Sequence, residues 1–429
     1  MSTGFDRDAD DFARGARAVV VYPDIGGSAR DADARLEETA GLAAAIGIDV
    51  AERTAFRIRQ PKPGTLIGSG QVEMLAETVR DHELQLAVFD AALTPIQQRN
   101  LESALGCKVI DRTGLILEIF GERARTAEGR LQVELAHLDY QAGRLVRSWT
   151  HLERQRGGFG FLGGPGETQI EADRRLIRDR MARLRRELDQ VSRTRTLQRD
   201  RRQRAPWPVI ALVGYTNAGK STLFNRLTGA DVMAENLLFA TLDPTLRQIS
   251  LPGIDKAILS DTVGFVSELP TQLVAAFKAT LEEVVSADLL IHVRDISHPD
   301  SEAQRADVEK VLSEIGVDET TPRIEAWNKI DLLDEERRAE LLAEAEGRED
   351  LMTVSAVTGE GVDALRRAMA ERLTTGHRRY VVRLDPADGA GAAWLHQHGE
   401  VLEHWMDEGD ALYEVRMAPR DHERFLSRT

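Results

Sequence analysis

The residues best suited to chemistry form a loop with the spacing Gly-x4-Gly-Lys-Ser, directly after the apolar run Val209–Val213. Glycines let the backbone N–H groups of such a loop turn toward anionic oxygens, and the following helix N-terminus adds a favourable dipole. Lys220 is expected to reach the β- and γ-phosphates, and the Ser221 hydroxyl to ligate Mg²⁺. The expected phosphate-binding residues are Gly214, Tyr215, Thr216, Asn217, Ala218, Gly219, Lys220, Ser221 and Thr222. The loop therefore predicts a nucleoside triphosphate site.

A second motif, Asn328-Lys329-Ile330-Asp331, predicts which base is bound. A carboxylate at Asp331 can accept hydrogen bonds from N1–H and the exocyclic amine of guanine. Adenine would leave buried polar groups unpaired, which costs several kcal/mol. Asn328, Lys329 and Asp331 therefore predict guanine, so the expected ligands are GTP and GDP. Ser355-Ala356 suits a backbone contact to the guanine O6, although this pair is by itself a weak signal.

Two segments between these motifs are expected to sense the third phosphate. Asp261-Thr262-Val263-Gly264 follows an apolar strand, where the aspartate can hold Mg²⁺ through water and the Gly264 N–H can touch the γ-phosphate. The first switch is expected at Phe239–Thr245, where a threonine ligates Mg²⁺ only when the γ-phosphate draws the loop inward. Thr241 and Thr245 both qualify, and either one could instead be an ordinary strand threonine. The expected nucleotide-binding residues of the switches are Phe239, Ala240, Thr241, Leu242, Asp243, Asp261, Thr262, Val263 and Gly264.

Phe265 occupies the position after Gly264, where many GTPases have a glutamine that orients the attacking water. Phenylalanine can neither accept a proton nor fix a water molecule. Hydrolysis by the isolated chain is therefore expected to be slow, with the missing group supplied by a partner or by rearrangement of the switches. The alternative is that the protein only binds GTP.

Length and composition place these motifs in a multidomain chain. At 429 residues the chain is long enough for about three domains of roughly 150 residues. No apolar run approaches the ~20 residues of a membrane span, and the polar, acidic stretch Met1–Asp11 is not a secretory signal. A single cysteine, Cys107, fits a reducing cytoplasm.

Charge is distributed unevenly along the chain. The net charge of −15 alone argues against a nucleic-acid partner, yet Arg174–Arg204 contains 13 arginines and four acidic residues. A basic arm on an acidic protein can contact a phosphate backbone at one chosen place. The alternative is a simply solvated helix face.

The elements around the nucleotide motifs follow from hydrophobic patterning. Residues 17–125 alternate apolar strand-like runs with helical stretches near 33–46, 70–82 and 94–105, which favours a parallel sheet with crossover helices. The strand-like runs are Ala18–Tyr22, Leu86–Phe89 and Lys108–Ile110. Gly68-Ser69-Gly70 is more typical of a turn than of a phosphate site. In the C-terminal tail, the pattern predicts strands at Tyr380–Leu384 and Leu412–Met417 with a helix at Ala392–Met406 between them.

Two heptad-like seams predict an antiparallel helical hairpin. The seam residues are Leu131, Leu135, Leu138, Ala142, Leu145, Trp149 and Leu152, and then Ile177, Met181, Leu184, Leu188 and Val191. Because each seam can be covered by the other, the chain is expected to be a monomer. The glycine-rich connector Gly157–Gly166 carries Phe159, Phe161 and Leu162, which either fold back onto the hairpin or insert into a partner.

The chain resembles the HflX family of ribosome-associated GTPases. The residues that carry the resemblance are Phe239–Thr245, Asp261–Phe265 and the stretch Gly163–Gln169 running into Glu171–Arg175. The resemblance implies docking on the large ribosomal subunit and its RNA, with the Gly157–Gly166 tip and the Arg174–Arg204 face making contact. It also implies splitting of stalled ribosomes under stress, and it favours Thr241 over Thr245 as the Mg²⁺ ligand beside Ser221.

The predicted fold is α/β, with a P-loop GTPase domain, an N-terminal α/β domain, an antiparallel helical hairpin and a small C-terminal α/β domain. The predicted boundaries are 1–125, 126–204, 205–373 and 374–429 for the N-terminal domain, hairpin, GTPase domain and C-terminal domain. The expected activity is GTP hydrolysis with Mg²⁺ in the cytoplasm, stimulated by ribosomes, with Lys220, Thr241 and Gly264 as catalytic residues. The alternatives are a GTP-dependent scaffold with little hydrolysis and a ribosome assembly factor.

Overall fold

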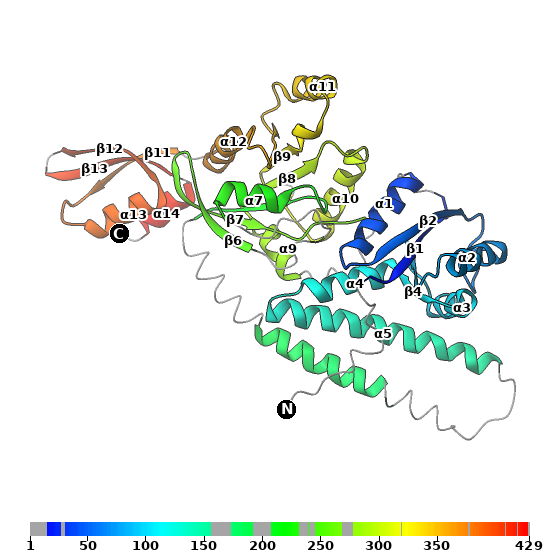
Figure 1. Ribbon diagram of the computed structural model, residues 1–429. Coiled ribbons are helices and arrows are strands. Elements are labelled where there is room, and N and C mark those ends of the chain that lie inside the picture. The colour runs from blue at the N-terminus through cyan, green and yellow to red at the C-terminus, as the bar shows by residue number, and fades with distance from the viewer. Residues whose placement is uncertain are drawn as a thin grey trace.

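The computed structural model describes most of the chain (Figure 1). The described residues are 15–26, 31–155, 172, 174–191, 207–230, 239, 245–267, 278–318, 320–375, 378–407, 409–417 and 419–427. Within these ranges the strands form three separate sheets, which confirms the predicted α/β class. Every helix in the same ranges is too short or too polar to traverse a lipid bilayer.

The N-terminal domain is a parallel sheet in the order β2-β1-β3-β4, with helices on both faces. Its strands are β1 Arg17–Asp24, β2 Asp49–Arg57, β3 Leu86–Phe89 and β4 Lys108–Asp111. Its helices are α1 Ala32–Ala44, α2 Ser69–Asp81, α3 Pro95–Leu105 and α4 Arg112–Arg123. Central strands covered on both faces are continuously apolar, which is why β1 and β3 were predictable. The prediction missed β2, because this edge strand carries charged residues that break the apolar pattern, and it also missed α4.

Gly68 is the N-cap of α2, where its N–H donates to Gln71 Oε1 at 2.8 Å. The expected turn is therefore the start of helix α2, with Ser69 and Gly70 in its first turn.

The helical hairpin consists of α5 Ala127–Gln155 and a helix of residues 174–191. The two lie side by side (Figure 1), and Arg180 pairs with Glu134 at 2.7 Å. Met181 and Leu184 of the predicted seam are buried, and Leu135 of the predicted seam on α5 is half-buried. The connector tip and the rest of the arginine-rich segment lie outside the described residues.

The GTPase domain is a sheet in the order β10-β9-β8-β5-β7-β6, parallel except for β6. The strands are β5 Val209–Val213, β6 Thr245–Leu251, β7 Ile254–Asp261, β8 Leu289–Asp295, β9 Arg323–Asn328 and β10 Leu351–Thr353. The helices are α7 Lys220–Thr228, α9 Lys278–Val285, α10 Ser301–Glu314, α11 Glu335–Ala345 and α12 Val362–Thr374, with a 3-10 turn at Ile330–Leu332. Parallel strands place their carboxyl ends at one edge, where ligands bind in open α/β sheets.

The C-terminal domain is an antiparallel sheet in the order β11-β13-β12 with two described helices. Its elements are β11 Arg378–Leu384, α13 Gly389–His398, β12 Glu400–Asp407, β13 Asp410–Met417 and α14 Pro419–Leu426. The predicted helix at 392–406 is wrong in its second half. Gly399 ends α13 in an extended conformation, and a Cβ there would lie 2.5 Å from Val415 Cγ1. The chain after it then pairs with β13 as a strand.

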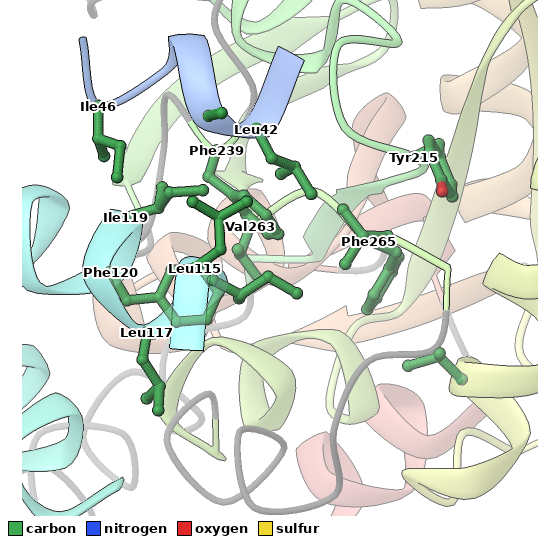
Figure 2. Packing of buried hydrophobic residues seen from close by; sticks show 14 of the residues in the cluster. Leu42, Ile46, Leu115, Leu117, Ile119, Phe120, Tyr215, Phe239, Val263 and Phe265 are labelled. Carbon is green, nitrogen blue, oxygen red and sulfur yellow. The ribbon is translucent and has the colours of Figure 1, made fainter. Parts of the chain in front are cut away.

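The N-terminal and GTPase domains share one hydrophobic core. Figure 2 shows Leu115 and Phe120 of α4 gathered with Phe239 and Val263 of the nucleotide switches, and the whole set belongs to one buried cluster. The rings of Phe120 and Phe239 meet edge to face, with centroids 4.8 Å apart. The N-terminal domain therefore packs directly on the residues that were predicted to respond to nucleotide. The predicted domain boundaries themselves stay predictions.

Candidate nucleotide site

The phosphate loop connects β5 to α7 and depends on the absence of side chains at two points. Gly214 has φ +151°, and a Cβ there would lie 2.2 Å from the Val293 carbonyl oxygen. Gly219 has φ +90°, and its Cβ would lie 2.2 Å from Asn328 Nδ2. Any other residue at these positions would push the loop away from β8 and β9. This close approach fits a loop whose backbone N–H groups surround an anion.

Lys220 is the first residue of α7 and is almost completely buried, with 6% of its surface exposed. Its ammonium donates hydrogen bonds to the carbonyl oxygens of Gly214 at 3.0 Å and Tyr215 at 2.7 Å. Burial lowers the pKa of Lys220 to about 8, although the negative charge of Asp261 opposes this shift. A phosphate group beside it would raise the pKa again, since it favours the charged form.

The Ser221 hydroxyl donates to Asp261 Oδ2 at 2.7 Å. This contact brings the predicted Mg²⁺ ligand of the phosphate loop together with the carboxylate at the end of β7. Both groups offer hard oxygen donors, which Mg²⁺ prefers together with phosphate oxygens and water. The hydroxyl of Ser221 and the carboxylate of Asp261 therefore fit Mg²⁺.

The segment after Asp261 lies against the phosphate loop. A Cβ on Gly264 would be 2.8 Å from Thr216 Cα and 3.1 Å from Lys220 Nζ, so only glycine fits there. The Phe265 N–H donates to the Gly214 carbonyl at 3.1 Å, and the Thr216 N–H donates to the Phe265 carbonyl at 2.7 Å. The Phe265 side chain is buried, with 1% exposed, and not directed into solvent.

The predicted base-recognition residues meet at the carboxyl ends of β9 and β10. Asn328 donates from Nδ2 to the Ala218 carbonyl at 2.8 Å and accepts the Ala356 N–H at 3.0 Å. This single side chain therefore joins the base motif, the phosphate loop and the Ser355-Ala356 pair. Asp331 lies in the 3-10 turn with its side chain exposed.

Lys329 forms an ion pair with Asp295 at 2.7 Å, and the sequence analysis did not include Asp295 in the site. A signal for it was present, because Asp295 ends the fully buried strand β8 at the same sheet edge as Asn328.

The first switch is described at its ends only. Phe239 is buried, with 2% exposed and φ +59°, and Thr245 begins β6. The expected residues Ala240, Thr241, Leu242 and Asp243 lie outside the described residues. Thr222, in α7, is half-buried, and Asp261, Thr262 and Val263 are buried.

Comparison with known proteins gives matches along almost the whole chain. Four family models match: GTP-binding GTPase N-terminal (33–121), GTP-binding GTPase Middle Region (123–202), 50S ribosome-binding GTPase (209–329) and HflX C-terminal domain (340–428). The chain is 53% identical to a GTPase HflX of Magnetococcus marinus over 91% of this chain and 90% of that protein. It is 43% identical to the GTPase HflX of Escherichia coli over 97% and 96%. A GTP-binding protein of Sulfolobus solfataricus, solved with GDP, covers 84% of this chain and 99% of its own at 24% identity, with a TM-score of 0.45.

Proposed function

Because the chain belongs to the HflX family of GTPases, we propose that it binds the large ribosomal subunit and splits stalled ribosomes under stress. The family model that matches residues 209–329 is described as a 50S ribosome-binding GTPase. GTP binding would promote association of the protein with the ribosome, and GTP hydrolysis would promote its release. Such a protein would act in the cytoplasm, as a monomer, on ribosomes.

The exposed arginines of the hairpin carry the RNA-binding part of this proposal. In the helix of residues 174–191, Met181 and Leu184 are buried on one side. Arg175, Arg178, Arg183, Arg185 and Arg186 are exposed around the rest of the same helix. Exposed arginines on a helix held by its apolar side can neutralise several phosphates of ribosomal RNA, and the affinity must then fall as salt rises. The tip at Gly157–Gly166 would extend this contact.

The site residues take complementary parts in the proposed mechanism. Lys220 would neutralise the β- and γ-phosphates, and the Gly264 N–H would bind the γ-phosphate. Ser221 and Thr241 would hold Mg²⁺, which supplies charge for the developing phosphate oxygens when bound. Asp331 would read guanine, with Asn328 keeping the base motif against the phosphate loop.

Phe265 is the reason to expect a partner in hydrolysis. Its side chain is buried and has no group that could orient a water molecule. A ribosome that supplies or rearranges such a group would raise the rate. The same observation also fits the second candidate, a GTP-dependent scaffold with little hydrolysis.

The test is GTP hydrolysis with and without purified ribosomes, together with co-sedimentation on large subunits and subunit separation in sucrose gradients. We expect binding with a non-hydrolysable GTP analogue and release with GDP, stimulated hydrolysis, and more free subunits. Binding without stimulation or splitting would select the scaffold. Absence of binding in both nucleotide states would rule out the ribosome as the partner.

A further inference from the structure

Ser267, three residues after Gly264, is held by the N-terminal domain. Arg112 Nη2 donates to the Ser267 hydroxyl at 2.8 Å and to its carbonyl at 3.1 Å. The Ser267 hydroxyl in turn donates to Glu38 Oε1 at 3.0 Å. Only 4% of Ser267 and 3% of Arg112 is exposed, so water competes little for these bonds.

The same network reaches the phosphate loop. The Ser267 N–H donates to the Tyr215 hydroxyl at 2.7 Å, and this hydroxyl donates to Glu38 Oε2 at 2.7 Å. Glu38 thus binds Tyr215 of the phosphate loop and Ser267 of the segment that follows Gly264 at the same time. A carboxylate that bridges two loops fixes their distance.

Buried acidic groups hold Arg112 itself in place. Its guanidinium pairs with Glu38 and with Asp90, and Asp90 also pairs with Arg35 at 2.8 Å. Removing one partner from a buried charge network leaves the others uncompensated, which is costly. The side chain of Arg112 is therefore a rigid support and not an adaptable surface arginine.

Gly264 directly precedes two anchored residues. Phe265 pairs through its backbone with Gly214 and Thr216, and Ser267, two residues further on, is bound to Arg112 and Glu38. These bonds hold the segment that begins at Gly264 against the phosphate loop before a γ-phosphate arrives. Ordering a binding group in advance lowers the entropy cost of binding.

Asp111, next to Arg112 in the chain, connects this support to the hairpin. Its carboxylate accepts hydrogen bonds from the Tyr140 hydroxyl at 2.6 Å and from Arg144 at 2.8 Å, both on α5. It also accepts the Gly114 N–H at 2.8 Å and so caps α4. A displacement of α5 must therefore act on the start of α4, where Arg112 lies.

We propose that Arg112 and Glu38 are positioning residues for the γ-phosphate contact of Gly264, and that Asp111 joins them to helix α5. GDP has no γ-phosphate, so loosening this support should weaken binding of GTP and leave binding of GDP unchanged. Movement of the hairpin would then change the preference between the two nucleotides, and by linkage the bound nucleotide would bias the hairpin.

The first experiment measures affinity for GDP and for a non-hydrolysable GTP analogue in the full-length Ser267→Ala variant. We expect analogue affinity to fall roughly three- to tenfold, as for the loss of one or two hydrogen bonds, with a parallel fall in kcat and unchanged GDP affinity. Ser301→Ala is the matched control, because Ser301 is also buried and also accepts from a buried arginine, Arg294 at 3.3 Å, in the same domain. This control should leave both affinities unchanged.

The second experiment tests the connection to α5 with Tyr140→Phe, which removes the hydroxyl that donates to Asp111 and accepts from Arg144. We expect analogue affinity to fall roughly two- to fivefold, and we expect no additional fall when Ser267→Ala is already present. Two residues that share no bonding partner normally act additively. Glu134→Gln, which removes the ion pair of α5 with Arg180, is the control and should change neither affinity.

Equal losses of GDP and analogue affinity in Ser267→Ala, or no loss of either, would overturn the positioning role. Additive effects of Tyr140→Phe and Ser267→Ala would overturn the connection to α5. Melting temperatures of all variants separate these outcomes from loss of folding. Because no ribosome is present in these measurements, their failure would leave the proposed ribosome function untouched.

Discussion

Lys220 is buried, and burial disfavours the positive charge that its side chain would need to bind phosphate. Its ammonium is enclosed by the phosphate loop, and burial lowers its pKa to about 8 despite the nearby carboxylate of Asp261. The loop carbonyls of Gly214 and Tyr215 hold it in place. We therefore expect protonation of this one side chain to be coupled to nucleotide binding near pH 8.

The coupling predicts how GTP affinity depends on pH. Burial lowers the pKa of Lys220 to about 8, and a bound phosphate should raise it. We therefore expect affinity to be highest well below pH 8 and to fall above it. We expect affinity to weaken about tenfold per pH unit between pH 8 and the higher pKa of the complex. Calorimetry in buffers of different ionisation enthalpy should show proton uptake on binding at pH 9.

Lys329→Arg is the control for this measurement, because it alters the other lysine of the site and should keep the pH dependence. Constant affinity from pH 7 to 9.5, without proton uptake, would show that Lys220 stays charged in the free protein.

Asp331 is the residue proposed to recognise guanine, and a single substitution can test this role. In Asp331→Asn an amide replaces the carboxylate that accepts from guanine, so GTP affinity should fall roughly 10- to 100-fold. Xanthosine triphosphate, which has an oxygen in place of the exocyclic amine, should then bind better than GTP. Competition binding with both nucleotides measures this change.

Asp334→Asn provides a matched control three residues away. Asp334 caps α11 by accepting the Arg337 N–H, and asparagine caps helices equally well. Nucleotide preference should not change in this variant. An unchanged preference in Asp331→Asn as well would place base recognition elsewhere.

At the scale of elements, the hairpin shows how a basic helix is kept in position. The helix of residues 174–191 buries Met181 and Leu184 and leaves most of its arginines exposed. α5 has a second apolar face, at Val133 and Ala136, which belongs to the core shared with α4. The seam pattern predicted that α5 lies against the helix of residues 174–191. It did not predict that the other face of α5 also packs into the protein core.

Leu184→Ala should loosen this helix. Leu184 is fully buried, and deleting such a side chain costs about 2–5 kcal/mol. Hydrogen exchange across 174–191 should speed up accordingly, and urea unfolding should begin earlier.

Leu176→Ala, in the same helix but with 67% of Leu176 exposed, is the control and should have little effect. If both variants behaved alike, Leu184 would not anchor the helix.

At the scale of the whole molecule, the N-terminal and GTPase domains act as one packed body around the switches. Phe120 of α4 is fully buried against Phe239, and Val263 and Phe265 belong to the same core cluster. The polar network of Arg112, Glu38 and Ser267 lies in the same interface. Nucleotide-dependent movement of the switches must therefore act on the N-terminal domain.

Phe120→Ala should accordingly affect both domains. A loss of about 3–5 kcal/mol is typical for a buried phenylalanine, and we expect faster hydrogen exchange in α4 and also at the end of β7. Phe89→Ala is the control, because Phe89 is equally buried but belongs to a core cluster confined to the N-terminal domain. Exchange at β7 should not change in that variant. If hydrogen-exchange protection at β7 were unchanged in Phe120→Ala, the two domains would be packed together but not coupled.

The sequence by itself determined the phosphate loop, the base motif and the seam of the second hairpin helix. Each depends on residues a few positions apart, whose spacing is set by one loop or one helix. The helix predicted at 392–406 failed because Gly399 and the pairing of β12 with β13 outweighed a helical pattern. Only the tertiary structure decided that Glu38 meets Ser267, across 229 residues of chain. Contacts of that range leave no periodic pattern in the sequence, because they arise when separately folded domains pack together.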